Sequence, residues 1–279
     1  MTVLNFQHLE EQNNVFVIAE IGINHSGNME KARALIREAA NVKADGVKLQ
    51  TYITEKRVPK DSPIFDILKK CELSFEQQAI LFKEAKEQSV VLFSTPFDEE
   101  SVDFLEEMDV PCFKIASFDI VNQKLLQYIA AKGRPVLCSR GMANREEIDR
   151  ALATFRTQKT PHALLHCISA YPVASLSDLH LRTIPVLKER YHCPIGYSDH
   201  SKGIEAAPIA VAAGAVIIEK HFMLESDADA PDAPVSLIPQ KFQEMVLSIR
   251  HISEMLGNSV WGATEAEKGT LQFRRVQSL

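Results

Sequence analysis

The sequence predicts a (β/α)8 TIM barrel, and three observations support this fold class. First, the 279 residues contain eight short apolar runs that each end on polar or ionisable residues. Second, stretches with helical periodicity fill the intervals, so each interval has room for one right-handed βα unit. Third, the length is ordinary for a single barrel of this kind. We therefore expect one domain over residues 1–279, with an N-terminal extension at 1–14 and a C-terminal tail at 257–279.

The eight apolar runs are expected to be the strands of the barrel. They lack polar alternation, as strands that are buried on both faces do. The runs are Val15–Gly22, Asp45–Gln50, Val90–Pro96, Pro111–Ser117, Pro135–Gly141, His162–Ser169, Pro194–Asp199 and Ala215–Phe222. Their endings read, in order, AEIGINH, VKLQ, FSTPFD, FKIAS, SRGM, HCISAYP, GYSDH and IEKHF. Since such a barrel builds its active site at the C-terminal ends of its strands, these endings predict a functional site at one mouth.

Helices are expected where apolar residues recur at helical spacing between the runs. They are Met29–Asn41, Ser74–Gln88, Glu99–Met108, Gln123–Lys132, Arg145–Phe155, Asp178–Tyr191, Gly203–Ala213 and Pro239–Leu256. The interval Thr51–Leu73 is too long for an ordinary βα loop. We expect a substrate-covering loop there, a short helix at Ile64–Cys71, or both. After Leu256 no further strand or helix is expected.

Composition narrows the class of protein. Apolar residues make up 46% and charged residues 24% of the chain, so we expect a sizeable core and no extended disorder. The net charge of −6 argues against a nucleic-acid surface, although a local cluster of lysines can still attract an anionic substrate. No apolar stretch reaches membrane-spanning length, and the polar N-terminus lacks the features of a signal peptide. Five cysteines without a CxxC motif indicate a cytoplasmic protein with buried, reduced thiols.

Several charged residues sit within or at the end of otherwise apolar strands. They are Glu20, Lys48, Lys114, Glu219 and Lys220. Strand alternation puts Lys48 on the same face as Gln50, and Glu219 on the same face as His221. For any single residue, a structural ion pair at the barrel rim explains the charge about as well as a functional role does. For the whole set, convergence at one mouth favours a site.

Two histidines end neighbouring strands. His200 follows the seventh run and His221 ends the eighth. Because adjacent strands lie about 4.8 Å apart, imidazoles at the same level can reach one metal ion. Two histidines with few other protein ligands leave coordination positions for water and a substrate oxygen, which suits a Lewis acid. This ligand set does not choose among Mn²⁺, Mg²⁺, Co²⁺, Fe²⁺ and Zn²⁺. A hydrogen-bonded core histidine is the alternative for either residue.

Cations and hydroxyl groups at the strand ends predict an anion site. The cations are Lys48, Lys114 and Arg140, and the hydroxyl groups are those of Ser94, Thr95, Ser117 and Ser169. Together they suit a phosphate or a carboxylate, and this fold often binds phosphate at this face. The sequence contains no Walker loop, Rossmann glycine pattern, GxSxG or HExxH. These absences argue against nucleotide-binding, dehydrogenase and hydrolase functions.

Seven segments of the chain carry a family resemblance. They are IAEIGINHSGNMEKA, ADGVKLQTY, FSTPFDEESV, FKIASFDI, LLHCISAYP, IGYSDHSKG and AAGAVIIEKHF. In this order they resemble the signature segments of the sialic acid synthase family. That family also contains legionaminate and pseudaminate synthases and the spore-coat polysaccharide synthase-like proteins. The resemblance runs from about Val15 to Leu256, and it is more specific for the family than for the substrate.

The resemblance implies a reaction and a set of residue roles. The reaction is condensation of phosphoenolpyruvate with a sugar aldehyde, usually an N-acylated amino sugar such as N-acetylmannosamine, to give a nonulosonic 2-keto acid and phosphate. The family's metal pair matches His200 and His221, with Mn²⁺ as the first choice and Mg²⁺ or Co²⁺ as alternatives. Its acid or base carboxylate matches Glu20, Gln50 lies near the sugar, and a sugar-hydroxyl carboxylate matches Asp232. Its phosphoenolpyruvate-binding positions match Lys48, Thr95, Lys114, Ser117, Ser169, Tyr171 and Ser198.

The chain departs from the family pattern in three places. Phe118-Asp119 replaces the usual Gly-Glu, and Arg140 stands where a small or hydroxyl residue is usual, adding a cation expected at the mouth. Family members usually continue into a C-terminal antifreeze-like domain that covers the partner's barrel and supplies an arginine to the sugar's acyl group. This chain ends at FRRVQSL, about where the linker to that domain begins. We therefore expect this sequence to form the barrel without this domain, whether the end is natural or a boundary of the sequence, and the resemblance implies a homodimer.

Two other functions compete with this one. A related barrel synthase could use a phosphorylated aldose and make a shorter 3-deoxy-2-keto acid, which Arg140 and the missing acyl-recognition domain favour slightly. A non-catalytic barrel retained for binding is the third hypothesis, and the shortened tail is its only support. The retained charges at Lys48, Lys114, His200 and His221 argue against it.

Overall fold

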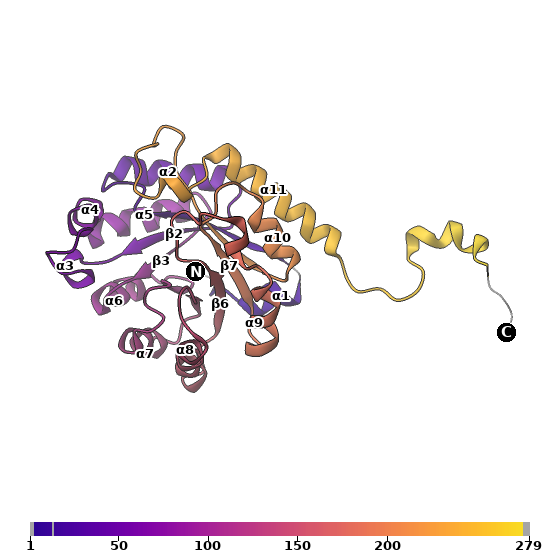
Figure 1. Ribbon diagram of the computed structural model, residues 1–279. Coiled ribbons are helices and arrows are strands. Elements are labelled where there is room, and N and C mark those ends of the chain that lie inside the picture. The colour runs from indigo at the N-terminus through magenta and orange to yellow at the C-terminus, as the bar shows by residue number, and fades with distance from the viewer. Residues whose placement is uncertain (1–2, 13, 276–279) are drawn as a thin grey trace.

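A closed barrel of eight parallel strands forms the centre of the protein (Figure 1). The computed structural model describes residues 3–12 and 14–275. The strands follow one another around the barrel in chain order, and β8 closes it by pairing with β1. They are β1 (Phe16–Gly22), β2 (Gly46–Thr51), β3 (Val91–Pro96), β4 (Phe113–Ile115), β5 (Val136–Ser139), β6 (His162–Cys167), β7 (Ile195–Asp199) and β8 (Ile217–His221). The predicted fold is confirmed, with one strand at each expected run, and only β2 extends past its run, by the single residue Thr51.

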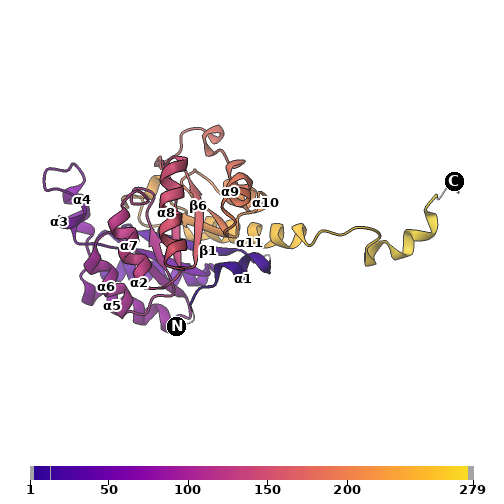
Figure 2. The ribbon, with the colours of Figure 1, turned by 90° about the horizontal axis from the view of Figure 1, so that it is seen from below.

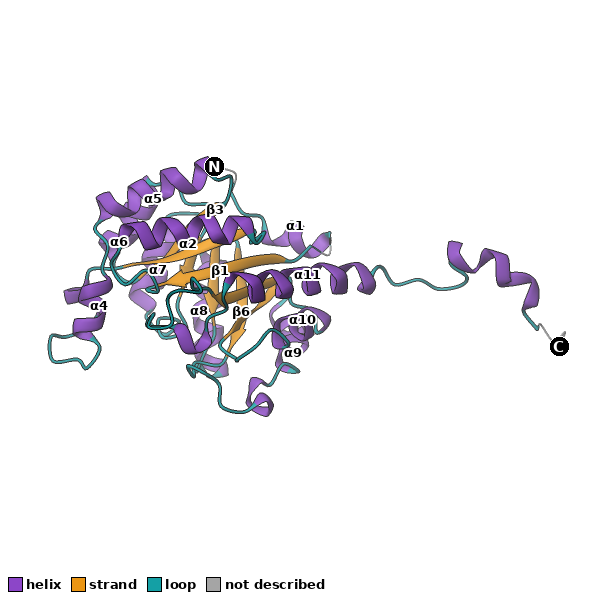
Figure 3. Ribbon diagram, turned by 90° about the horizontal axis from the view of Figure 1, so that it is seen from above, coloured by secondary structure: helices purple, strands orange, loops and turns teal. Residues whose placement is uncertain are grey.

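Helices surround the strands, as the purple and orange ribbons of Figure 3 show. The expected helices are present as α2 (Met29–Asn41), α5 (Phe75–Glu87), α6 (Glu99–Glu107), α7 (Gln123–Ala131), α8 (Arg145–Thr157), α9 (Thr183–Tyr191), α10 (Ala206–Ala212) and α11 (Pro239–Leu256). Their beginnings follow from side-chain caps. Asn28 accepts a hydrogen bond from the backbone of Lys31 at the start of α2, and Ser74 with Gln77 forms the predicted capping box of α5.

Two helices begin later than the sequence predicts, for reasons of backbone geometry. Before α9, a 3-10 helix at Leu176–Leu179 ends on His180, whose left-handed φ of 47° interrupts the helical path. Before α10, Gly203 has a φ of +82°, which a right-handed helix does not allow.

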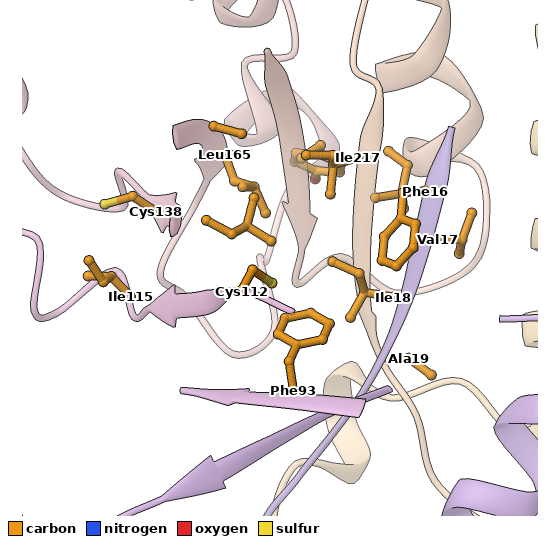
Figure 4. Close-up of a cluster of buried hydrophobic side chains, with 14 of the residues drawn as sticks. Phe16, Val17, Ile18, Ala19, Phe93, Cys112, Ile115, Cys138, Leu165 and Ile217 are labelled. Atoms are coloured by element: carbon orange, nitrogen blue, oxygen red, sulfur yellow. The ribbon is translucent and has the colours of Figure 1, made fainter. Parts of the chain in front are cut away.

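The inside of the barrel is closed at its N-terminal end by apolar side chains, several of which are labelled in Figure 4. Gly46 makes room for this floor. A Cβ atom at Gly46 would lie 3.0 Å from the ring of Phe16 and 3.3 Å from the ring of Phe93. Both rings are buried. Since the floor is filled, the space above it opens only at the C-terminal ends of the strands.

The long interval after β2 contains two helices, α3 (Thr54–Arg57) and α4 (Phe65–Cys71). The second confirms the short helix expected at Ile64–Cys71, whereas the first was not expected. Thr54 is fully buried, and its hydroxyl and backbone N–H both donate to the carboxylate of Glu72. These bonds hold the start of α3 against the residue that follows α4.

Both ends of the chain contain a helix that the sequence analysis did not include. The segment Phe6–Glu11 forms helix α1, and Phe6 is buried in the main core. The tail contains a 3-10 helix at Glu265–Phe273, although no helix was expected after Leu256. Figure 2 shows this tail projecting away from the barrel beyond α11. Within residues 3–12 and 14–275, no helix is long and apolar enough to cross a membrane.

Candidate active site

A cavity of about 420 Å³ opens at the C-terminal mouth of the barrel. Most residues that the sequence predicts for the site line it, namely Glu20, Lys48, Gln50, Thr95, Lys114, Ser117, Tyr171, Ser198, His200, Glu219, His221 and Asp232. Ser94, Arg140, Ser169 and Lys220 do not line it, and the Ser94 hydroxyl lies 2.6 Å from that of Thr51 instead. A larger surface hollow of about 600 Å³ lies beside α9 and α10, but its lining is mainly apolar and none of the predicted residues reaches it. The chemistry-bearing residues therefore converge in the smaller cavity.

Two buried lysines and two buried glutamates form a charge network at the cavity base. The Lys48 ammonium lies 2.7 Å from a Glu20 oxygen and 3.7 Å from a Glu219 oxygen. The Lys114 ammonium lies 3.8 Å from the other Glu219 oxygen. Strand register explains these contacts, because Glu20 pairs with Lys48 across β1 and β2. Buried charges persist only when they are paired in this way.

Hydroxyl groups complete the hydrogen bonding of this network. Lys48 donates to Thr95 Oγ1 at 3.1 Å, and Lys114 donates to Ser139 Oγ at 2.7 Å. Ser198 donates to Glu219 Oε1 at 2.8 Å. These bonds hold both lysines in place beside the cavity. The cavity is large enough for a small anion.

The protonation of the network follows from burial and pairing. Burial raises the pKa of Glu20, against the opposing effect of Lys48. Burial would also raise the pKa of Glu219, but Lys114, Lys48 and Ser198 outweigh it and hold that pKa at about 2. Glu219 is therefore a fixed anion, whereas Glu20 is the carboxyl group of this pair that takes up a proton more readily.

Burial lowers the pKa of Lys114, and Glu219 opposes this only in part. For Lys48, burial acts in the same sense, but Glu20 and Glu219 outweigh it and raise the pKa. The two lysines thus differ in how much anionic charge they already face. An incoming anion therefore stabilises the charge of Lys114 more than that of Lys48.

The two predicted histidines lie side by side, with ring centroids 5.4 Å apart. His200 Nδ1 donates to the carbonyl of Ile168 at 2.8 Å, which leaves Nε2 free as a ligand atom. Burial lowers the pKa of His200 to about 4, so its imidazole is neutral. His221 Nδ1 is buried without a hydrogen-bond partner and lies 3.4 Å from Asp232. Burial would lower the pKa of His221, but the Asp232 carboxylate outweighs it and raises that pKa.

These donors fit a divalent metal with open positions. A neutral imidazole and an unpartnered imidazole nitrogen beside a carboxylate are what borderline metals bind. Among residues 3–12 and 14–275, no group of three or more His, Cys, Asp or Glu side chains is arranged to hold a metal. The chain thus offers two imidazoles, and water or substrate oxygens would have to supply the other ligands.

The remaining predicted residues form the upper wall of the cavity. The ring of Tyr171 packs on His200, with centroids 4.1 Å apart. Ser169 donates to Ser117 Oγ at 2.8 Å, which places it directly behind the cavity lining. Gly141 allows this approach, because a Cβ atom there would lie 2.4 Å from Ser117 Cβ. Gln50 donates to Glu20 at 3.3 Å and so links the charge network to the wall.

The structure does not bring Arg140 or Lys220 to the cavity. Arg140 follows Ser139, which faces inward, so its own side chain points outward and donates to His166 Nδ1 at 3.1 Å. Lys220 lies between the inward residues of β8 and forms a buried ion pair with Asp199. Two of the cations expected at the mouth are therefore structural. Arg140 at the mouth was one of the two arguments for a phosphorylated aldose as substrate. Its outward position removes that argument.

Three cavity residues with polar or ionisable side chains were not among the predicted site residues. Ser139 and Cys167 line the cavity from β5 and β6, and strand alternation would have found both. Arg57 lines it from α3. The sequence placed Arg57 only in a loop near the mouth, because no periodicity says where a loop side chain points.

The fold and the cavity define a class of protein, namely a (β/α)8 barrel enzyme with lysines, carboxylates and paired imidazoles at its mouth. A family model described as the NeuB family matches residues 35–261. The chain belongs to the NeuB family, which confirms the resemblance inferred from the seven segments.

Known relatives cover most of the chain. N,N'-diacetyllegionaminic acid synthase of Campylobacter jejuni is 35% identical, over 93% of this chain and 82% of that protein. Pseudaminic acid synthase of the same species is 33% identical, over 88% of this chain and 75% of that protein. The crystal structure of N-acetylneuraminic acid (sialic acid) synthetase from Leptospira borgpetersenii matches with a TM-score of 0.90 and 38% identity, over 94% of this chain and 91% of that chain. These relatives are named for three different products, so family membership does not fix the substrate.

Proposed function

We propose that this protein condenses phosphoenolpyruvate with the aldehyde of an N-acylated amino sugar, giving a nonulosonic 2-keto acid and phosphate. The observation that carries the proposal is the convergence of Lys48, Lys114, Glu20 and two imidazoles in one cavity of a NeuB-family barrel. A cytoplasmic location and a homodimer, both expected from the sequence, remain part of this proposal.

The lysines and hydroxyl groups would bind phosphoenolpyruvate. Lys114 has only one carboxylate within 4 Å among the described residues, at 3.8 Å, so an anion can approach it closely. Thr95, Ser117 and Ser198 present hydroxyl groups in the same cavity. Charge-assisted hydrogen bonds of this kind are short and strong in a water-poor site. As phosphate departs, the same cations offset the charge that develops on it.

Glu20 is the residue we assign to proton transfer. Its carboxyl group is buried, its pKa is raised, and both Lys48 and Gln50 orient it. A carboxyl group whose pKa is shifted towards neutrality is suited to general acid or base catalysis. It would exchange a proton with the sugar oxygen or with the water that adds to C2 of phosphoenolpyruvate.

His200 and His221 would hold a divalent metal, with Mn²⁺ as our first choice and Mg²⁺ or Co²⁺ as alternatives. When bound, such a metal supplies Lewis-acid polarisation of the aldehyde carbonyl. The protein's own contribution is to keep His200 neutral and oriented through the Ile168 carbonyl. Asp232 lies beside His221, where a sugar hydroxyl could also reach it.

The test is a product assay. The protein is incubated with phosphoenolpyruvate, Mn²⁺ and a panel of aldoses that includes N-acetylmannosamine, while phosphate release and product mass are measured. We expect phosphate release and a nine-carbon keto acid, and loss of both after treatment with a chelator. Absence of phosphate release with every sugar, while an active relative turns over in the same assay, would rule out the proposed reaction. A seven- or eight-carbon product would instead support the phosphorylated-aldose alternative.

A further inference from the structure

Arg57 is a cation of the cavity that the proposed reaction does not yet use. It lies on α3, outside the barrel, and lines the same cavity as Glu20 and Lys48. Among the residues that the structure describes, no carboxylate lies within ion-pair distance of its guanidinium, whereas Lys48 has two and Lys114 has one. A largely buried guanidinium with free N–H groups is a binding site for an acceptor oxygen.

The guanidinium is held rigidly before any ligand arrives. It stacks on the ring of Phe97, 3.6 Å from the centroid, and lies 4.6 Å from the centroid of Tyr52. Its Nη1 donates to Gln50 Oε1 at 3.0 Å. The Tyr52 hydroxyl is fixed in turn by donating to the carbonyl of Leu68 at 2.9 Å. A guanidinium has five N–H donors, and within the described part of the chain the hydrogen bond of this group is the one to Gln50, so its other N–H groups can donate to a ligand.

Arg57 lies farther from the barrel floor than the two lysines, at the level where we expect the sugar and not phosphoenolpyruvate. Its partner Gln50 lies two residues beyond Lys48 on β2, which is about 6.6 Å nearer the mouth at 3.3 Å per residue. The lysines that suit phosphoenolpyruvate lie at the lower level. Arg57 is therefore placed above the anion site, on the side from which a sugar would enter.

The neighbours of Arg57 narrow the chemistry of its ligand. Ile64, Ile67 and Phe118 line the same cavity at its rim and are 47%, 49% and 58% exposed. An acylamino group has a carbonyl oxygen for the guanidinium and an apolar methyl or alkyl end for these side chains. A hydroxyl group without an acyl group would make no contact with the apolar side chains at the rim. A phosphate would lose part of its hydration against them, which is unfavourable.

We propose that Arg57 is a substrate-recognition residue that donates to the acyl carbonyl oxygen of the sugar, while the acyl methyl group packs against Ile64, Ile67 and Phe118. The proposal rests on the proposed function and deepens it, because it names a residue of this chain that selects N-acylated sugars. Since a buried donor left unpaired is costly, the missing carbonyl should weaken binding of an unacylated sugar about 10- to 100-fold.

The experiment compares Arg57→Met with Lys56→Met. Lys56 is the adjacent cation on α3, but it pairs with Glu100 and does not line the cavity, so it is a matched control. In the presence of phosphoenolpyruvate and Mn²⁺, binding of N-acetylmannosamine and of mannose is measured by calorimetry for each protein, and KM and kcat are measured where turnover occurs. Binding of phosphoenolpyruvate alone serves as the folding control, and it should be unchanged in both variants.

The unchanged protein and Lys56→Met should prefer the acylated sugar, and Arg57→Met should lose that preference through Kd and KM rather than kcat. The inference is overturned if Arg57→Met weakens both sugars equally, if it weakens neither, or if the unchanged protein binds neither sugar. A larger loss for a phosphorylated or carboxylated sugar than for N-acetylmannosamine would also overturn it in favour of anion recognition. In all these cases phosphate release and a nine-carbon product with another N-acylated amino sugar would leave the proposed function standing, whereas absence of release with every sugar would remove both.

Discussion

Lys220 and Asp199 form an ion pair of 3.0 Å in which neither side chain is exposed to solvent. They are register partners on β8 and β7, and each precedes one of the two cavity histidines in sequence. Asp199 Oδ1 also accepts hydrogen bonds from the Tyr197 hydroxyl at 3.1 Å and from the backbone N–H of Ser201 at 2.8 Å. The pair therefore fixes the strand end and the turn that carry His200, from the side opposite the cavity.

Replacing Lys220 with Met should lower the free energy of unfolding by about 3–5 kcal/mol, because the Asp199 carboxylate is then buried without its cation. The double variant Lys220→Met/Asp199→Asn should recover much of this loss, since an uncharged amide keeps an acceptor for Ser201 and Tyr197. Urea denaturation followed by circular dichroism measures both.

An exposed ion pair provides the control for that measurement. The Lys241 ammonium lies 2.7 Å from a Glu244 carboxylate oxygen on the surface of α11, and these side chains are 52% and 39% exposed. Lys241→Met should change stability by less than about 1 kcal/mol. If Lys220→Met and Lys241→Met lower the free energy of unfolding by the same amount, burial does not determine how much these ion pairs stabilise the protein.

Phe6 should anchor the N-terminal helix to the barrel. Its ring is 3% exposed and belongs to the main core, so Phe6→Ala should cost about 3 kcal/mol of unfolding free energy through lost burial and a cavity. Phe273 is 74% exposed in the tail, and Phe273→Ala should be within about 0.5 kcal/mol of the unchanged protein. Equal effects of the two variants, measured by thermal unfolding, would show that α1 does not pack as described.

The contrast between α1 and the barrel shows what the sequence could predict. The strands carry continuous apolar runs, and the helices that the sequence predicted carry apolar residues at helical spacing, so their type and order followed directly. Helix α1 has one buried residue in a polar segment, which is too weak a pattern to detect. The 3-10 helix Glu265–Phe273 buries nothing, so no hydrophobic periodicity marks it.

The site residues also fall into those that the sequence could predict and those that it could not. Lys48, Lys114, His200 and His221 were predictable because regular strands fix which alternate residues face inward. Arg140 was expected at the mouth because its run ends there, but β5 ends at Ser139, and Ser139 is the inward residue. Arg57 depends on how α3 folds over the mouth, which local sequence does not specify.

Lys114→Met should weaken phosphoenolpyruvate binding about 10- to 100-fold, because charged hydrogen bonds to an anion contribute roughly 1.5–3 kcal/mol each. Metal binding should be unchanged, since Lys114 contacts Ser139 and Glu219 rather than the histidines. Calorimetric titration measures both affinities. Lys124→Met removes an exposed cation that pairs with Glu99 and should alter neither. Equal weakening by the two variants would mean that overall charge, not this contact, attracts the anion.

His166 should make stability depend on pH. Its Nε2 donates to the Leu179 carbonyl at 2.7 Å and its Nδ1 accepts from Arg140, so the ring is held neutral. Burial, with the adjacent Arg140 charge, lowers the pKa of His166 from 6.5 to about 4. Below pH 6.5 the unfolded chain therefore binds a proton more readily than the folded one, and stability present above pH 6.5 is lost as the pH falls towards 4.

Between pH 7 and pH 4.5, His166→Gln should thus lose less stability than the unchanged protein, by roughly 3 kcal/mol at 1.4 kcal/mol per pKa unit. Other buried histidines cancel in this comparison because both proteins contain them. Arg140→Met should show a smaller shift in the same direction, since the guanidinium no longer opposes protonation of the ring. Its phosphoenolpyruvate affinity should be unchanged, because Arg140 faces away from the cavity. Parallel stability–pH curves for all three proteins, measured by urea denaturation, would show that His166 titrates alike in the folded and unfolded chains.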